Sequence, residues 1–123
     1  MEDLYQEQIL DHANNPRNKK LIENHTCAGM GENPSCGDRA ELYFLVEENK
    51  IKDVGFQGEG CAVSIASISM LTEKLIDMDL NDVKNIMPGD IYKMLGIKIS
   101  PARVNCALLS YSALENTIKN CKI

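Results

Sequence analysis

The sequence predicts an α+β fold in which helices pack on a small antiparallel sheet of about three strands. Residues 40–60 contain two runs rich in Tyr, Phe, Val and Ile on either side of a polar turn at residues 47–50, which is typical of a β-hairpin. Residues 62–76 and 101–118 instead carry apolar residues at helical spacing. With 123 residues, 44% of them hydrophobic, the chain can form one compact core, so we expect a single domain over residues 1–123.

The N-terminal part of the chain predicts one helix and one further strand. Apolar residues within residues 3–12 have helical spacing, and Pro16, with the two asparagines before it, ends that helix. Residues 25–30 are expected to add a third, shorter strand ahead of the hairpin. This strand and the hairpin make up the predicted sheet.

Three further helices are expected in the C-terminal part of the chain. Residues 81–87 and 90–95 predict two short helical pieces, broken by Pro88-Gly89. Ser100-Pro101 suits the N-cap and the first position of a longer helix, which we expect to continue through Ile118.

The loop at residues 33–38 contains two potential metal ligands, which is about half the number that a metal site needs. It presents a thiol, Cys36, and a carboxylate, Asp38, two residues apart. Pro34 fixes one backbone angle and Gly37 frees another, so the two side chains can point to a common centre. Such a centre needs further ligands, which two other cysteines could supply.

Cys61 and Cys106 have local surroundings that suit this role. Cys61 lies at the N-terminus of the helix expected over residues 62–76, where unsatisfied amides and the helix dipole favour the thiolate. The alternative for Cys61 is a small buried hydrophobic residue. Cys106 falls in the second turn of the last predicted helix. Arg103, three residues earlier on the same face, could stabilise a thiolate or offset the charge of an anionic metal cluster.

The five cysteines are expected to be reduced thiols, because their odd number and irregular spacing do not match a disulfide framework. No Cys-x-x-Cys pair occurs in the sequence, so the fold would have to assemble any metal site from distant segments. We assign structural or incidental roles to Cys27 and Cys121. The two histidines, His12 and His25, are assigned surface or capping roles rather than metal ligation.

Charge and hydropathy exclude several classes of partner. The formal net charge is -5 and Lys and Arg form no cluster, so neither nucleic acid nor an anionic membrane is expected to bind. The longest apolar runs are far shorter than the roughly 20 residues of a membrane span, and the N-terminus lacks a basic-then-apolar signal pattern. We therefore expect a cytoplasmic protein.

Three cysteine motifs resemble those of the iron–sulfur cluster assembly scaffold family, which includes IscU, SufU and the N-terminal domain of NifU. The motifs are NPSCGD at residues 33–38, GEGCAVSIASISMLTE at residues 58–73 and PARVNCALLS at residues 101–110. The resemblance covers nearly the whole chain. It implies the family fold, a small antiparallel sheet of about three strands with helices packed on it.

Carried over residue by residue, the resemblance implies that Cys36, Cys61 and Cys106 are thiolate ligands and that Asp38 is the carboxylate beside them. Three thiolates and a carboxylate suit tetrahedral zinc or an iron–sulfur cluster. We expect zinc in the protein as isolated, and iron or a [2Fe-2S] cluster in function.

The resemblance also implies transfer of persulfide sulfur from a cysteine desulfurase. We expect Cys36 to be the acceptor, because it lies in a loop whereas Cys61 and Cys106 are each fixed in a helical turn. Arg39 or Arg103 is expected to stabilise the freed thiolate. Cys106 is the competing acceptor.

Two functions in iron–sulfur biogenesis are compatible with these motifs, and neither is that of a classical enzyme. The first is a scaffold that assembles a [2Fe-2S] cluster and passes it to acceptor apo-proteins or carrier proteins. The second is a SufU-like zinc-dependent sulfurtransferase that stimulates the desulfurase without holding a cluster. A structural zinc module is a third, less favoured function, because structural sites tend to use local paired ligands.

The segment before the third cysteine resembles the SufU branch. In the scaffold branch, a Leu-Pro-Pro-Val-Lys segment and a histidine stand before the third cysteine. Here residues 101–105 are PARVN instead. Because that segment binds an Hsp70-type chaperone in the scaffold branch, no such chaperone is expected as a partner here. The span from Cys61 to Cys106, however, is short and scaffold-like.

Overall fold

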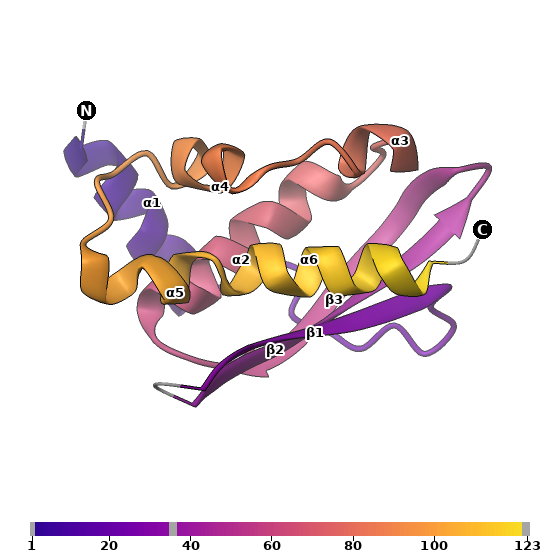
Figure 1. Cartoon of the computed structure of the whole chain (residues 1–123), viewed down its shortest axis with the longest axis horizontal. Coiled ribbons are helices and arrows are strands. Elements are labelled where there is room, and N and C mark those ends of the chain that lie inside the picture. Colours follow the sequence, from indigo (N-terminus) through magenta and orange to yellow (C-terminus); the bar gives the residue numbers. More distant parts are fainter. Residues whose placement is uncertain (1, 35–36, 122–123) are drawn as a thin grey trace.

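The computed structural model of the protein describes residues 2–34 and 37–121. It shows a three-stranded antiparallel sheet with helices packed on it, which confirms the predicted α+β fold (Figure 1). The strands lie side by side in chain order. They are β1 (Cys27–Asn33), β2 (Asp38–Glu47) and β3 (Lys50–Glu59).

The predicted hairpin is present and has a two-residue turn. Glu48 and Asn49 join β2 to β3 with φ angles of 52° and 64°. Two successive positive φ angles are typical of the type I′ turn, whose twist matches that of the flanking strands. β1 is longer than the strand expected over residues 25–30, because its last residue, Asn33, still pairs with Asp38 at the start of β2.

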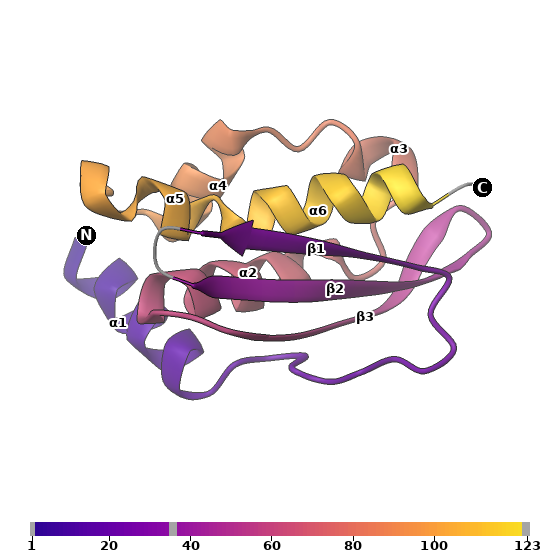
Figure 2. The same cartoon turned by 60° about the horizontal axis from the view of Figure 1, so that its bottom comes forward.

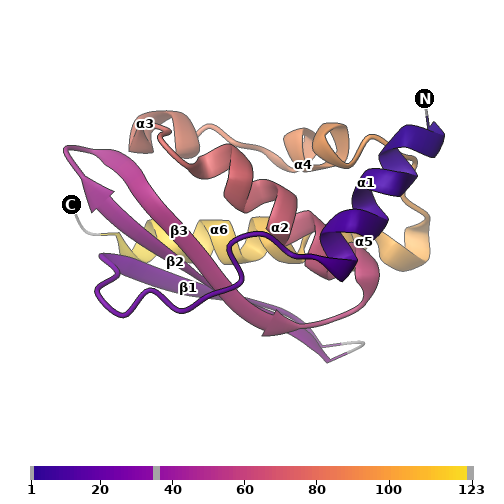
Figure 3. The same ribbon diagram turned by 180° about the vertical axis from the view of Figure 1, so that it is seen from behind.

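The helices lie mainly on one face of the sheet. α2 packs against β3 and α6 against β1 and β2, while α1 and α4 pack against α2 (Figures 1 and 3). Their buried side chains form one hydrophobic core with those of the strands. The helical elements are α1 (Glu2–Asn14), α2 (Ala62–Leu75), α3 (Leu80–Val83), α4 (Pro88–Leu95), the 3-10 turn η1 (Pro101–Arg103), α5 (Val104–Ala107) and α6 (Leu109–Asn120).

The prediction of one long C-terminal helix from Ser100 through Ile118 is wrong in one respect, because the observed helix is interrupted. It begins as the 3-10 turn η1 and breaks again at Leu108, between α5 and α6. Hydroxyl groups explain the second break. Ser67 of α2 donates to the carbonyl of Ala107 at 2.8 Å, so a side chain takes an oxygen that a continuous helix would use.

The two short helices expected before it also differ from the prediction. Only Leu80–Val83 is helical within the first segment. Pro88 does not separate two helices but occupies the first turn of α4, where its missing N–H costs nothing. The Asp90 carboxylate then accepts a hydrogen bond from the Met87 N–H at 2.8 Å and closes the N-terminus of that helix.

The prediction that all five cysteines are reduced is wrong for one pair. Cys27, the first residue of β1, forms a disulfide with Cys121, which follows α6. Their Cα atoms are 5.1 Å apart, a usual separation for this bond. The pairing arises because α6 runs along β1, so residues 94 positions apart in sequence become neighbours. Of the structural or incidental roles assigned to these two cysteines, the bond agrees with the structural one.

Each edge strand of the sheet makes hydrogen bonds with a segment outside the sheet. At one edge the segment between α1 and β1 runs beside β3, where the Phe56 N–H donates to the carbonyl of Asn18 at 3.0 Å (Figure 3). At the other edge, Asn116 and Asn120 of α6 donate side-chain amides to β1 carbonyls at 2.6 and 2.7 Å. Figure 2 shows α6 lying along β1 in this way. These hydrogen bonds occupy part of each edge and so oppose pairing with other chains there.

The contact between α6 and β1 requires glycine in the strand. A Cβ atom at Gly31 would lie 2.5 Å from the carbonyl oxygen of Leu109 and 2.7 Å from the nitrogen of Ala113. Both are backbone atoms of α6, so no side-chain rotation could relieve the overlap. Gly31 therefore sets how closely α6, and the α5 segment before it, can approach the sheet.

We expect Gly31→Ala to lower the free energy of unfolding by about 1–3 kcal/mol, the usual cost of overpacking a close contact. Gly89→Ala is the matched control, because a Cβ at Gly89 would meet nothing within 4 Å and the residue lies in the first turn of α4. Urea unfolding of the two variants tests this. Equal stability of Gly31→Ala and the wild type would contradict the contact.

His12 is buried rather than at the surface, so the surface or capping role assigned to it is wrong. Its Nδ1 lies 2.7 Å from Ser69 Oγ, and its Nε2 lies 3.4 Å from a carboxylate oxygen of Glu73. Ser69 Oγ also accepts the N–H of Arg17 at 2.8 Å, which leaves the hydroxyl proton to donate to a neutral His12 ring. This network joins α1 and the segment after it to α2.

Burial lowers the pKa of His12, and the nearby Arg17 guanidinium lowers it further, against the opposing charges of Glu73 and Asp11. The folded protein therefore favours the neutral ring. A lowered folded-state pKa gives stability that is complete above the ordinary value of about 6.5 and is lost as the pH falls below it. We expect the unfolding free energy of the wild type to decrease over this range, and His12→Asn to flatten that slope. Identical slopes in urea titrations would contradict this role.

Within the described residues, the structure contains no helix long and apolar enough to cross a membrane.

Candidate metal centre

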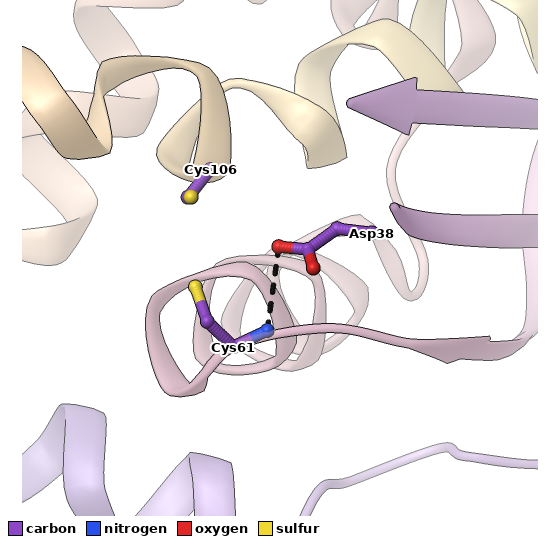
Figure 4. Close-up of side chains that lie close together, drawn as sticks. All are labelled: Asp38, Cys61 and Cys106. Atoms are coloured by element: carbon purple, nitrogen blue, oxygen red, sulfur yellow. Dashed lines mark hydrogen bonds between the residues drawn. The ribbon is translucent and has the colours of Figure 1, made fainter. Parts of the chain in front are cut away.

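Three of the predicted ligands meet at one end of the sheet. One carboxylate oxygen of Asp38 and the sulfur atoms of Cys61 and Cys106 all lie within 4.8 Å of one another. Figure 4 shows the side chains converging from three separate segments, namely the start of β2, the residue before α2, and α5. Cys36, the fourth predicted ligand, lies outside the described residues and is two positions before Asp38 in the sequence.

Asp38 is held by the first turn of α2. The residue is 7% exposed, and its Oδ2 accepts hydrogen bonds from the Ser64 hydroxyl at 2.7 Å and the Cys61 N–H at 3.3 Å. An N–H at a helix N-terminus has no partner within its own helix, so a carboxylate is stabilised there. Gly60 makes the approach possible, because a Cβ at this position would lie 3.0 Å from Asp38 Cγ.

The two described thiols differ in how readily they ionise. Burial opposes ionisation of Cys61, but hydrogen bonds from the backbone and hydroxyl of Ser64 and from Cys106 outweigh it, so the pKa of Cys61 lies below its ordinary value. Burial, and then the hydrogen bond with Cys61 and its charge, raise the pKa of Cys106. Cys61 is therefore the first of the two to become a thiolate, with Cys106 as its hydrogen-bond donor.

The position of Cys61 agrees with the sequence interpretation. It is the N-cap residue of α2, with extended backbone angles of φ -69° and ψ 170°. Its side chain is partly exposed, whereas Cys106 is 3% exposed. Cys61 is therefore not fully buried, as the alternative interpretation would require.

Of the two predicted arginines, Arg103 faces the sulfur atoms. A hydrogen bond with Cys106, followed by the charges of Cys61 and Cys106, raises the pKa of Arg103. Arg39 directly follows Asp38 on β2, and successive side chains of a strand point to opposite faces. Arg39 is exposed where Asp38 is buried, so its side chain leaves the sheet on the face opposite to Asp38.

Two polar residues of the site were not singled out from the sequence. Ser64 binds Asp38, as described above, and Asn33 donates its side-chain amide to Cys106 Sγ at 3.7 Å. A sequence signal exists for both. Ser64 is three residues after Cys61, and hence in the same helical turn, while Asn33 begins the motif that contains Cys36.

The described donor atoms fit a thiophilic metal centre. Thiolate sulfur binds zinc and iron–sulfur clusters, and a carboxylate can complete either set. The segments that supply these donors lie far apart in sequence and are held in place by hydrogen bonds among themselves. The partly exposed Cys61 gives the centre an opening to solvent.

Comparison with known proteins agrees with this geometry. The family model for the NifU-like N-terminal domain matches residues 4–123. The zinc-dependent sulfurtransferase SufU of Bacillus subtilis is 33% identical, over 96% of this chain and 91% of that protein. The iron–sulfur cluster assembly scaffold protein IscU of Thermotoga maritima is also 33% identical, over 94% of this chain and 93% of its own.

A solved structure shows the same architecture. The crystal structure of a putative iron–sulfur cluster assembly scaffold protein for the SUF system, from Fervidobacterium islandicum AW-1, superposes with a TM-score of 0.75. It is 34% identical, and the match covers 91% of this chain and 94% of that one. The resemblance inferred from the three cysteine motifs is therefore confirmed, and the chain belongs to the NifU-like N-terminal domain family.

Proposed function

We propose that this protein accepts persulfide sulfur from a cysteine desulfurase and supports the assembly and transfer of [2Fe-2S] clusters. The site comprises Cys36, Asp38, Cys61 and Cys106. The observation that carries the proposal is the convergence of Asp38, Cys61 and Cys106 within 4.8 Å at a partly open end of the sheet. The family, with its members named as scaffolds and as a sulfurtransferase, supports the same chemistry.

The sulfur-transfer step proposed here requires a thiolate at Cys36. This thiolate attacks the outer sulfur of a persulfide on the desulfurase, so a new S–S bond forms on Cys36. The S–S bond of the donor breaks at the same time, and the desulfurase cysteine leaves as a thiolate. The step conserves both the number of sulfur atoms and the total charge, so it needs no outside oxidant or reductant. Arg103, beside the other two thiols, would stabilise the negative charge that gathers there.

Cys36 is proposed as the acceptor because the other two cysteines are held by helices. Cys61 caps α2, and Cys106 is buried in α5 with Asn33 bonded to its sulfur. In the sequence, Cys36 stands between the last residue of β1 and the first residue of β2, two positions before Asp38. Zinc, when bound, would keep the ligating cysteines deprotonated until the donor arrives.

The test is mass mapping after incubation with a cysteine desulfurase and isotopically labelled cysteine. We expect the first labelled persulfide on Cys36, and no stimulation of the desulfurase by Cys36→Ala. Cys106→Ala should still accept the label. Label on Cys106 in both the wild type and Cys36→Ala would overturn the assignment of the acceptor.

The second candidate function is that of a zinc-dependent sulfurtransferase which stimulates the desulfurase and holds no cluster. The Pro-Ala-Arg segment at residues 101–103, which resembles that of the SufU branch, favours it, as does the influence of both thiols on Arg103. Both functions share the sulfur-accepting step, and they differ in what the site holds afterwards. In protein as isolated, we expect zinc in either case.

The proposal carries further expectations about the chain. We infer a single domain over residues 1–123, because α1, the sheet and the later helices contribute to one core. We also infer a cytoplasmic protein that works with acceptor apo-proteins or carrier proteins. Since PARVN stands at residues 101–105, an Hsp70-type chaperone is not among the proposed partners.

A further inference from the structure

Ser64 contacts three parts of the candidate centre. Its hydroxyl oxygen lies 2.7 Å from Asp38 Oδ2, 3.3 Å from the carbonyl oxygen of Cys106 and 3.6 Å from Cys61 Sγ. The side chain is fully buried, in the first turn of α2. One hydroxyl group therefore links β2, the start of α2 and α5.

The shortest hydrogen bond of the Ser64 hydroxyl is the one it donates to Asp38. A serine carries one hydroxyl proton, and the carboxylate is both the closest acceptor and the strongest. The Cys61 N–H donates to the same carboxylate oxygen at 3.3 Å. Two donors from neighbouring positions thus fix the direction of the Asp38 side chain.

The packing beside these groups restrains them further. A Cβ atom at Gly60 would lie 3.0 Å from Asp38 Cγ and 3.0 Å from Ser64 Cβ. Gly60, Asp38 and Ser64 are therefore in close contact, and any larger residue at position 60 would have to displace one of the other two. This arrangement keeps the carboxylate against Ser64 and toward the sulfur atoms.

We propose that Ser64 is a positioning residue of the metal centre, which holds the Asp38 carboxylate in place as a ligand beside Cys61 and Cys106. This inference rests on the proposed metal-binding function. Hydrogen bonds from outside the ligand set orient ligands in many metal sites, and their loss changes metal binding by about 10–100-fold. The shortest hydrogen bond of Ser64 is the one to Asp38, so we expect its effect on the metal to be transmitted chiefly through that carboxylate.

The test compares four proteins, namely the wild type, Asp38→Ala, Ser64→Ala and the double variant. Each is loaded with Co²⁺, whose visible spectrum reports ligand geometry, and with Zn²⁺, whose transfer to a chelator is timed. We expect Ser64→Ala to change both readouts in the same direction as Asp38→Ala, with a change in the transfer rate of about tenfold. The double variant should behave as Asp38→Ala alone, because the two residues act as one unit.

Ser67→Ala is the matched control for a lost buried hydroxyl. Ser67 lies one turn further along α2, is also fully buried, and bonds to Ala107 and Ser110 rather than to Asp38 or a thiol. We expect it to lower thermal stability about as much as Ser64→Ala while leaving the cobalt spectrum and the zinc transfer rate at wild-type values. Gly60→Ala provides a second variant, which should disturb the carboxylate if Ser64→Ala fails to fold.

The outcomes separate this inference from the proposed function. A wild type that binds neither metal through its cysteines would remove the proposed function itself. Metal binding in the wild type with unchanged spectrum and transfer rate in Ser64→Ala would overturn only the role of Ser64. So would a Ser64→Ala effect that persists in the Asp38→Ala background, or an Asp38→Ala variant that behaves as wild type.

Discussion

Replacing Cys61 or Cys106 by serine should abolish stoichiometric zinc binding, with a loss of affinity of more than about 100-fold. That figure exceeds the 10–100-fold cost of losing a supporting hydrogen bond, because a direct ligand is removed. Among the described residues, the potential ligands that meet here are the two sulfur atoms and the Asp38 carboxylate, all within 4.8 Å of one another. No further described thiolate belongs to this group, so a lost one would not be replaced. Cys36→Ser is expected to have the same effect. Zinc content and a competition titration with a chelator measure it.

Cys121→Ser is the control for this series, because Cys121 pairs with Cys27 at the start of β1, whereas the site lies where β1 ends and β2 begins. It should retain full zinc occupancy. Full occupancy in all three of Cys36→Ser, Cys61→Ser and Cys106→Ser would show that the metal site has been assigned to the wrong residues.

Reducing the Cys27–Cys121 disulfide should lower the free energy of unfolding by about 2–4 kcal/mol. The bond closes a sequence separation of 94 residues and so restricts the unfolded chain strongly. It also joins the end of α6 to the strand on which that helix packs. Urea unfolding with and without a dithiol reductant measures the difference, and non-reducing peptide mapping verifies the link.

Cys121→Ser provides the control for the effect of the reductant, since Cys121 is partly exposed and a serine hydroxyl there can reach water. In this variant the stability should be low already and should not change on adding the reductant. If the wild type were equally stable in both conditions, the disulfide would contribute nothing to the fold.

The parts of the fold that the sequence could predict are those that depend on local signals. The hairpin was predictable because Tyr, Phe, Val and Ile flank a short polar turn, and the turn residues Glu48 and Asn49 indeed adopt the backbone that a hairpin needs. The start of α2 was predictable because two glycines precede Cys61 and apolar residues at helical spacing follow it.

Features that depend on contacts between distant segments could not be predicted. The break at Leu108 results from a hydroxyl of α2, 40 residues away from the carbonyl it binds. The pairing of Cys27 with Cys121 follows only once α6 lies along β1. In the same way, the sequence motifs identify Cys61, but the role of Ser64 becomes visible only when Asp38 is brought against it.

Anaerobic reconstitution tests the central claim most directly. The protein would be incubated with a cysteine desulfurase, cysteine, a thiol reductant and Fe²⁺, re-purified, and assayed for iron, acid-labile sulfide and visible absorption. We expect iron and sulfide in equal amounts with the spectrum of a [2Fe-2S] cluster, and neither in Cys61→Ser or Cys106→Ser. Persulfide on the wild type without iron or sulfide would support the zinc-dependent sulfurtransferase instead. Absence of persulfide, iron and sulfide from the wild type would contradict the proposed function.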